Sequence, residues 1–454
     1  MRRVLCLLLV FFFMLPFCAF ATEIDPPGGG AGDGELPVEE PKELAATAKS
    51  AFVYETLSEQ FLFEKNIRER LPIASLTKIM TSLLVIEYGG FAEMATANGT
   101  AYFDMEPDGS TQNIVQGEIM SVEDLLYCTM VSSANEACNI LAEHISGSVA
   151  AFVEMMNARA RELGCTDTNF VNTHGLHDDG HYSTAYDQLL IIKEAMKHPE
   201  FMELVNTTAK SVPATNMAES RALYTTNHLI SRRTFTGYIY HLAQGIKTGY
   251  TSKAGYCLAS SAASNGLSLI TIVMGCERVD DLVMSFVETR EMMEWAFESF
   301  AYRVILRATD EFHSVNVELG KDVSEVNVKP RNSLTALVPI DLEDEDIERI
   351  ITLPDTVTAP VAKGQVLGEV TLSYGNTVYG TVPLTADFDV ELSQEESVMQ
   401  DIMEVVRKPW IRYAVMAIVA VILLYVVAVL LYNAGRRRSR GSSRGNYRGK
   451  RRRW

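Results

Sequence analysis

The sequence predicts an α+β domain, a smaller all-β domain after it, and one transmembrane helix near the C-terminus. Residues 45–300 mix strand-like alternation with amphipathic helical periods, whereas residues 301–392 contain only short alternating runs. The transmembrane helix is expected over residues 411–433, where the uncharged apolar stretch from Tyr413 to Tyr432 is 20 residues long. At about 1.5 Å per residue, such a helix crosses a hydrocarbon core of roughly 30 Å.

The first 21 residues have the features of an export signal. Two arginines precede a long apolar run, which ends at Ala19-Phe20-Ala21, an A-x-A cleavage pattern. We expect removal of residues 1–21, after which residues 22–44, rich in Pro, Gly and acidic residues, form a flexible linker. Lipid attachment at Cys18 is a weaker alternative, because bulky residues precede it.

Local patterns predict the elements of residues 45–300. Alternation indicates two strands within 50–66, and apolar periodicity indicates helices. The helices are expected over 75–88, 121–145, 150–164 and 280–300. Asn265-Gly266 separates two apolar runs, so it predicts a two-residue hairpin turn that pairs position 257 with position 274.

Cysteines outside the signal number five, an odd count for an exported protein. They are Cys128, Cys138, Cys165, Cys257 and Cys276. A complete set of disulfides is therefore impossible. Because the predicted hairpin does not place Cys257 opposite Cys276, we expect buried free thiols.

Residues 301–392 predict a small β-sandwich. The runs HSVNVEL, SEVNVKP, GEVTLSYG and TVYGTVPL alternate and are separated by turn residues. No cluster of His, Asp and Cys occurs in them, which favours a spacer or partner-binding role. Residues 393–410 are expected to form an amphipathic helix that leads into the membrane.

The formal net charge of −18 is unevenly distributed. The signal holds two arginines and residues 434–454 hold ten basic residues, which leaves −30 for residues 22–433. Such an acidic body repels phosphate backbones, so we expect no nucleic-acid partner. The ten basic residues after the span place the tail in the cytoplasm and the body outside, with membrane lipid as the partner of the C-terminal helix.

The motif SLTK, from Ser75 to Lys78, opens one of the predicted helices. Its spacing puts the lysine amine one turn from the serine, on the same face. Serine needs a neighbour that accepts its proton, and a desolvated lysine with a lowered pKa can do so. We expect repulsion from Lys247 to lower the pKa of Lys78.

Two further motifs, SAN and KTG, offer groups for a peptide substrate. At the predicted junction of two helical segments, the Ser133 hydroxyl can relay a proton and the Asn135 amide can hold a substrate amide. KTG is expected at the head of a strand, where Lys247 and Thr248 can bind a carboxylate and Gly249 permits close backbone approach.

The order of the three motifs is more specific than any one of them, since a second SxN occurs by chance at Ser314-Val315-Asn316. SxN follows SxxK by about 55 residues, and KTG follows about 110 residues later. With the blocks PIASLTKIMT, VSSANEACNILAE, NTHGLHDDGHYSTAYD and QGIKTGYTSKAGYCLASSA, residues 48–392 resemble the low-molecular-mass penicillin-binding proteins, the serine-type D-Ala-D-Ala carboxypeptidases. The resemblance implies a serine β-lactamase/transpeptidase-like domain, a sheet flanked by helices with an all-helical part.

The resemblance also implies roles for the motif residues. Ser75 would be the acylated nucleophile and Lys78 its general base. Ser133 would pass a proton to the leaving D-alanine, and Asn135 would orient the substrate and the lysine. The N–H groups of Ser75 and Tyr250 would form the oxyanion hole.

The implied substrate is the peptidoglycan pentapeptide, with β-lactams as inhibitors and no metal or cofactor. Lys247 and Thr248 would bind the terminal carboxylate. Relatives add an arginine after the strand that follows KTG, but ungapped counting places Leu282 there, with Arg278 as the nearest candidate.

Alternative activities of this site are D,D-endopeptidase, transpeptidase and β-lactamase. His174, His177 and His181 could serve a zinc peptidase, although GLHDDGHYST reads as a Gly-containing loop and lacks the helical HExxH spacing. The favoured interpretation is a loop that lines the cleft and leads to a helix capped by Ser183 or Thr184. A catalytically silent wall-binding protein is disfavoured by the intact motifs.

Overall fold

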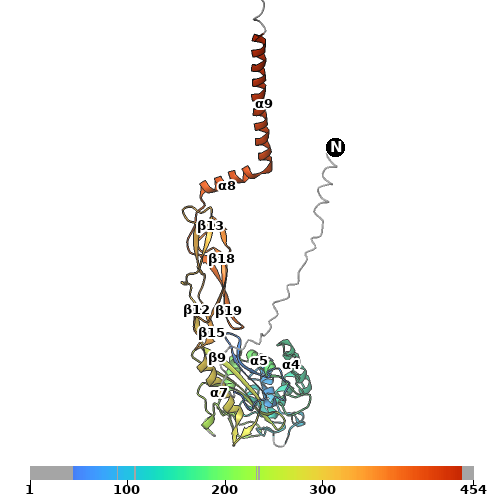
Figure 1. The fold of residues 1–454 in the computed structure, drawn as a ribbon. Coiled ribbons are helices and arrows are strands. Elements are labelled where there is room, and N and C mark those ends of the chain that lie inside the picture. The colour runs from blue at the N-terminus through green and yellow to red at the C-terminus, as the bar shows by residue number, and fades with distance from the viewer. Residues whose placement is uncertain (1–43, 89, 107–108, 232, 234–235, 442–454) are drawn as a thin grey trace, which may run out of the picture. The chain divides into compact units, whose positions relative to one another are not determined.

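The computed structural model describes residues 44–441, apart from 89, 107–108, 232 and 234–235 (Figure 1). The predicted signal, nearly all of the predicted linker and most of the basic tail lie outside these residues. Internal contacts divide the chain into two compact units. The first comprises the described part of residues 1–303 with 336–348 and 373–379, and the second comprises the rest. The predicted domain boundaries stay predictions.

A five-stranded antiparallel sheet forms the centre of the first unit, with strand order β2-β1-β9-β8-β7. Its strands are β1 (Ser50–Glu55), β2 (Gln60–Lys65), β7 (Ala243–Thr251), β8 (Gly255–Ser264) and β9 (Leu267–Cys276). The two strands predicted within 50–66 are confirmed. β7, which carries KTG, lies at one edge, and β2 lies at the other.

The hairpin of β8 and β9 turns at Asn265-Gly266, as predicted. Both turn residues have positive φ, at 51° and 84°, as a type I′ turn requires. The predicted register holds from the turn to Leu258, which pairs with Val273, and shifts beyond that point. All five cysteines among the described residues are free and buried, which confirms the expectation of free thiols.

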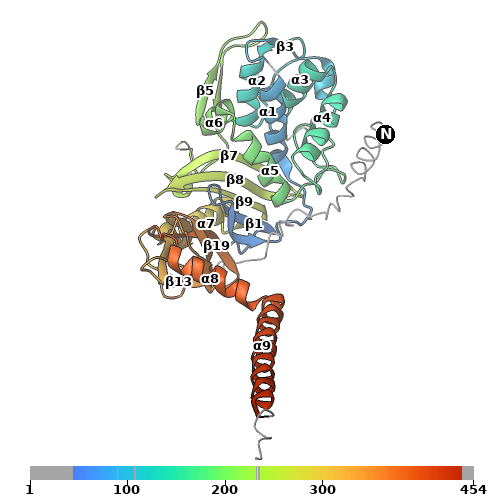
Figure 2. The same cartoon turned by 90° about the horizontal axis from the view of Figure 1, so that it is seen from above.

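Helices cover both faces of the sheet (Figure 2). They are α1 (Thr77–Tyr88), α2 (Val122–Met130), α3 (Asn135–Ser146), α4 (Val149–Glu162), α5 (Ala185–Ala195), α6 (Pro199–Asn206) and α7 (Met284–Ser299). α5 and α6 pack on one face, where α1 to α4 complete a helical part, and α7 packs on the other. The predicted helical stretch over 121–145 is two helices, α2 and α3, and the SAN motif stands at their junction, with Asn135 as the first residue of α3.

Short elements complete the first unit. The turns η1 (Ala74–Leu76), η2 (Gly99–Tyr102) and η3 (Thr236–Tyr238) are 3-10 helices. Three two-stranded antiparallel sheets pair β3 (Met94–Thr96) with β4 (Ile119–Ser121), β5 (Ala209–Val212) with β6 (Arg221–Tyr224), and β10 (Arg278–Val279) with β11 (Leu282–Val283).

The alternation along β1 divides the buried apolar side chains between two cores. Phe52 and Tyr54 belong to the cluster under the helical part, whereas Ala51 and Val53 belong to the cluster that includes Trp295 of α7. Successive residues of a strand point to opposite faces, so this strand contributes to both layers.

The segment after α7 is all-β until residue 386, as predicted. Its strands are β12 (Phe300–Leu306), β13 (Ser314–Glu318), β14 (Glu325–Pro330), β15 (Leu334–Pro339), β16 (Glu348–Thr352), β17 (Thr356–Thr358), β18 (Val366–Tyr374) and β19 (Thr377–Ala386). They form a six-stranded sheet, β16-β18-β19-β14-β13-β17, and the pair β12-β15.

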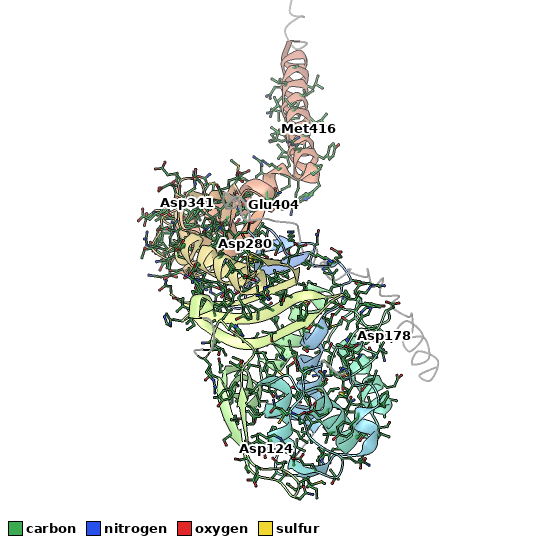
Figure 3. The ribbon with its side chains drawn as sticks, turned by 90° about the horizontal axis from the view of Figure 1, so that it is seen from below. Asp124, Asp178, Asp280, Asp341, Glu404 and Met416 are labelled. Atoms are coloured by element: carbon green, nitrogen blue, oxygen red, sulfur yellow. The ribbon has the colours of Figure 1, made fainter. Side chains whose placement is uncertain are left out.

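Two helices end the described chain, α8 (Gln394–Arg407) and α9 (Pro409–Gly441). The Ser393 hydroxyl caps α8 by accepting from Glu396 N. Within the described residues, Pro409–Arg436 is the one stretch of helix long and apolar enough to span a membrane, with a mean hydropathy of 3.2. Apolar side chains such as Met416 project from it (Figure 3).

Candidate active site

Ser75 and Lys78 lie where the SLTK motif predicts them, on consecutive turns at the start of α1. Ser75 is in η1 and Lys78 is the second residue of α1, with the lysine Nζ 2.9 Å from the serine Oγ. Ala74, directly before the serine, has a φ of 47°. Non-glycine residues in this left-handed region are strained and are concentrated at functional sites.

The amine of Lys78 is completely enclosed. Besides Ser75, it donates to Asn135 Oδ1 at 2.7 Å and to the backbone oxygen of His174 at 2.8 Å. The side chain is 0 % exposed. Three acceptors from three parts of the chain thus hold the amine at the serine.

Burial lowers the pKa of Lys78 to about 8. Our prediction that repulsion from Lys247 causes this shift is wrong, since the charges of Cys138 and Glu136 are the next largest influences and raise the pKa. Repulsion between the lysines instead adds to burial in lowering the pKa of Lys247. A lysine that readily loses its proton can act as a base near neutral pH.

SAN and KTG meet through Ser133 and Lys247. The Lys247 Nζ donates to the Ser133 Oγ at 3.0 Å and to the Thr248 backbone oxygen at 3.0 Å, and Lys247 is 1 % exposed. Ser133 has a φ of 65° between α2 and α3. The Thr248 Oγ1 lies 2.5 Å from that of Thr226.

KTG lies inside β7 and not at its head, which corrects our prediction. The strand begins at Ala243, and its register against β8 shifts between Gln244 and Lys247. Gly245, with a φ of 59°, stands at this bulge. The glycine resembles a strand boundary in the sequence, but a strand can continue through such a bulge.

Gly249 lets β7 lie close against the serine turn. A Cβ at this position would lie 3.0 Å from Ser75 N and 3.1 Å from Ala74 Cβ. The next residue, Tyr250, exposes 57 % of its surface, and its ring centroid lies 4.4 Å from that of Tyr256. The oxyanion role of the Ser75 and Tyr250 N–H groups stays a prediction.

The loop with the three histidines packs against η1. Gly175 has a φ of 93°, and a Cβ there would lie 1.9 Å from the Ala74 oxygen, so only glycine fits. As expected, the loop leads to a helix capped by a hydroxyl, which is that of Thr184, accepting from Asp187 N at 3.0 Å.

The three imidazoles make separate contacts, which gives the zinc interpretation no support. His174 Nε2 lies 2.9 Å from Asp104 Oδ2, and His181 Nε2 lies 2.8 Å from Thr77 Oγ1. His177 Nε2 lies 3.2 Å from Asp179 Oδ1. Burial lowers the pKa of His181 to about 3, so this ring is neutral.

Three residues of the site have no predicted role in the motifs: Asp104, Glu136 and Gly175. Asp104 holds the His174 ring, Glu136 lies beside Asn135, and Gly175 packs on η1. In the sequence, Gly175 could have been noticed from the run His174-Gly175-Leu176, and Glu136 from its position as an acidic residue in a helix that is otherwise largely apolar. Arg278, the candidate carboxylate ligand, lies in the β10–β11 hairpin and donates to Asp281 at 3.3 Å.

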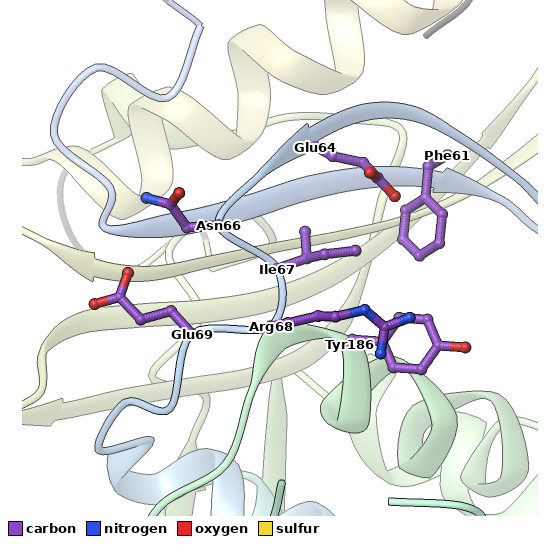
Figure 4. Close-up of a pocket in the computed structure, with 7 residues that line it drawn as sticks. All are labelled: Phe61, Glu64, Asn66, Ile67, Arg68, Glu69 and Tyr186. Carbon is purple, nitrogen blue, oxygen red and sulfur yellow. The ribbon is translucent and has the colours of Figure 1, made fainter. Parts of the chain in front are cut away.

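Two other features of the first unit lie outside the motifs. A pocket of about 360 Å³ is formed by β2, the following loop and α5, and it is lined by Phe61, Glu64, Asn66, Ile67, Arg68, Glu69 and Tyr186 (Figure 4). Glu87, Glu194 and His198 come close enough to hold a metal, but Arg159 donates to both glutamates, at 2.6 and 3.1 Å. None of the motif residues belongs to either group.

Two serine–lysine pairs characterise this site. The buried Lys78 amine donates to Ser75, and the buried Lys247 amine donates to Ser133. Such a pairing can activate a serine for covalent attack on a carbonyl without a histidine. Together with the helix-flanked sheet, it defines a serine acyl-transfer enzyme of the transpeptidase-like class.

Comparisons with known proteins give the family. Residues 37–278 match the model of the peptidase S11 family, "D-alanyl-D-alanine carboxypeptidase", and residues 300–392 match "Penicillin-binding protein 5, C-terminal domain". The chain is 31 % identical to D-alanyl-D-alanine carboxypeptidase DacF of Bacillus subtilis, over 86 % of this chain and 95 % of DacF. It is 32 % identical to D-alanyl-D-alanine carboxypeptidase DacA of Haemophilus influenzae, over 71 % of this chain and 80 % of DacA.

Solved structures agree. Penicillin-binding protein 5 from Haemophilus influenzae superimposes with a TM-score of 0.56 at 29 % identity, covering 78 % of this chain and 99 % of that one. Penicillin-binding protein 6B from Escherichia coli superimposes with a TM-score of 0.57 at 26 % identity, covering 77 % of this chain and 98 % of that one. The chain belongs to the peptidase S11 family. It is a serine-type D-Ala-D-Ala carboxypeptidase with the C-terminal domain of penicillin-binding protein 5, as the sequence motifs predicted.

Proposed function

We propose that this enzyme removes the terminal D-alanine from peptidoglycan stem peptides through an acyl-enzyme on Ser75. The observation that carries the proposal is the 2.9 Å contact between Ser75 Oγ and the fully buried Lys78 amine. In its neutral form, Lys78 accepts the serine proton as Oγ attacks the carbonyl carbon of the penultimate D-alanine. The N–H groups of Ser75 and Tyr250 stabilise the oxyanion.

Collapse of this intermediate breaks the peptide bond. Ser133, next to the Lys247 amine, passes its hydroxyl proton to the nitrogen of the leaving D-alanine and takes up the proton that Lys78 received from Ser75, so that the Lys78 amine is neutral again. Lys247 and Thr248 hold the terminal carboxylate. Asn135 keeps Lys78 in place while water, deprotonated by the same amine, hydrolyses the ester and frees Ser75.

Labelling of the full chain in membranes with a fluorescent penicillin tests the nucleophile. We expect a stable adduct in the native enzyme and in the control Ser132→Ala, whose hydroxyl donates to the Cys128 oxygen. The adduct should be absent in Ser75→Ala. Release of D-alanine from a pentapeptide should be lost in the same variant.

Other outcomes would contradict the proposal. Failure of the native protein to label would exclude the serine mechanism. Rapid release of hydrolysed penicillin would indicate a β-lactamase, cleavage of cross-linked peptides alone would indicate an endopeptidase, and inhibition by a chelator but not by penicillin would indicate a metal enzyme.

The proposed location is the outer face of the cell membrane, with α9 as the single span and the basic tail inside. The ten basic residues after the span, against Arg407, Lys408 and Arg412 before it, support this orientation. Protease added to spheroplasts should digest the catalytic body and leave a C-terminal epitope tag intact. Digestion of the tag would show that the tail lies outside and would contradict the proposed orientation.

A further inference from the structure

Glu136 is a buried carboxylate beside the motif residues that the proposed reaction does not use. It follows Asn135 in the first turn of α3 and is 2 % exposed. Its Oε1 accepts from Thr111 Oγ1 at 2.8 Å and from Gln112 N at 2.7 Å. Its Oε2 is buried and has no hydrogen-bond partner among the described protein atoms. Burying a carboxylate with one unsatisfied oxygen costs free energy of folding, which indicates that the group is kept for a role in the site.

The segment that Glu136 binds also touches Asn135. Asn135 N donates to the Ser110 oxygen at 2.9 Å, and a Cβ on Gly109 would lie 2.9 Å from Asn135 Nδ2. On its other side, Asn135 Oδ1 accepts from the Lys78 amine at 2.7 Å. The Asn135 amide therefore lies between segment 109–114 and the lysine.

We propose that Glu136 is a positioning residue of this active site. By tying segment 109–114 to α3, its carboxylate fixes Asn135 and, through Asn135, the amine of Lys78. The inference rests on the proposed function, in which Lys78 accepts the proton of Ser75. Glu136 acts through Asn135 and not on the reacting atoms.

The charge of Glu136 also acts on the lysine. Charged or titratable groups face Lys78 from α3, from β7 and from the histidine loop, namely Glu136, Cys138, Lys247, His174 and His181. Glu136 raises the pKa of Lys78, against the larger lowering by burial. Removal of this charge alone should let the amine lose its proton at a lower pH.

Glu136→Gln and Glu136→Ala in the full chain separate charge from contact. Glutamine keeps an oxygen for Thr111 and Gln112, so acylation by penicillin should persist while the acidic limb of its pH profile moves to lower pH. Alanine also removes the tie to segment 109–114, and acylation should fall about tenfold. The control Glu143→Gln, further along α3 and partly exposed, should match the native enzyme in rate and profile.

A Glu136→Gln profile that coincides with the native one would overturn the inference, and so would native acylation in Glu136→Ala. If the alanine variant does not fold, the glutamine profile decides. Normal acylation in Lys78→Ala would instead overturn the proposed function on which the inference rests.

Discussion

In the proposed reaction, Lys78 makes the site sensitive to pH, because its amine must be neutral to accept the proton of Ser75. Burial lowers the pKa of Lys78 to about 8, so the protonated form prevails below that pH. The second-order rate of acylation should therefore fall about tenfold for each pH unit below about 8 and level off above it. Stopped-flow labelling with penicillin measures this; a profile that stays flat down to pH 6 would contradict it.

Residue types and spacing indicated the groups of the proposed reaction but not all of their surroundings. Ser75, Lys78, Ser133 and Lys247 were recognisable because their chemistry resides in side chains at fixed spacings. The contribution of His174 was not recognisable, since it holds Lys78 with a backbone oxygen that every residue possesses. The cause of the lysine pKa was missed because burial results from packing between segments distant in the sequence.

At the scale of elements, close packing of the histidine loop on η1 defines the serine turn. Gly175→Ala would place a Cβ 1.9 Å from the Ala74 oxygen at a φ of 93°. We expect a loss of about 2–4 kcal/mol in the free energy of unfolding and loss of penicillin labelling. Gly147→Ala is the control, because its φ is 79° with nothing within 4 Å, and it should cost about 1 kcal/mol and label normally.

A buried ion pair joins β6 to the segment before β4. Arg221 Nη1 and Nη2 donate to Glu118 at 2.6 and 2.8 Å, and the glutamate side chain is 0 % exposed. Arg221→Ala leaves this carboxylate buried without its partner and should destabilise the fold by about 3–5 kcal/mol. Arg290→Ala, which breaks the exposed pair with Glu294, should cost less than about 1 kcal/mol, and urea titration of both variants measures the two losses. Equal losses would refute the distinction.

Element types were predictable and their ends were not. Periodicity gave the helices, and Asn265-Gly266 gave the β8–β9 turn, because both signals are local. The start of β7 was misplaced because Gly245 resembles a boundary, although its pairing with β8 across the bulge carries the strand through. Such pairing depends on a partner strand that is distant in the sequence, so the residues around Gly245 do not reveal it.

At the scale of the whole molecule, α9 is the part that can hold the enzyme in a membrane. A chain that ends at residue 408 keeps α8 but lacks α9, and it should leave the membrane fraction with salt or carbonate, whereas the full chain should require detergent. Both should release D-alanine from a soluble peptide at similar rates. Retention of the shortened chain against carbonate would show that α8 anchors by itself.

The five buried thiols have a consequence for how the enzyme matures. Proteins that function outside the cell, where we propose the body of this enzyme lies, commonly rely on disulfides, whereas the described part of this chain has only free cysteines, all within its packed interior. Its folding should therefore need no thiol oxidase, no disulfide isomerase and no electron acceptor for disulfide formation. The melting temperature should be the same with and without dithiothreitol, and the enzyme should remain active in strictly anoxic surroundings.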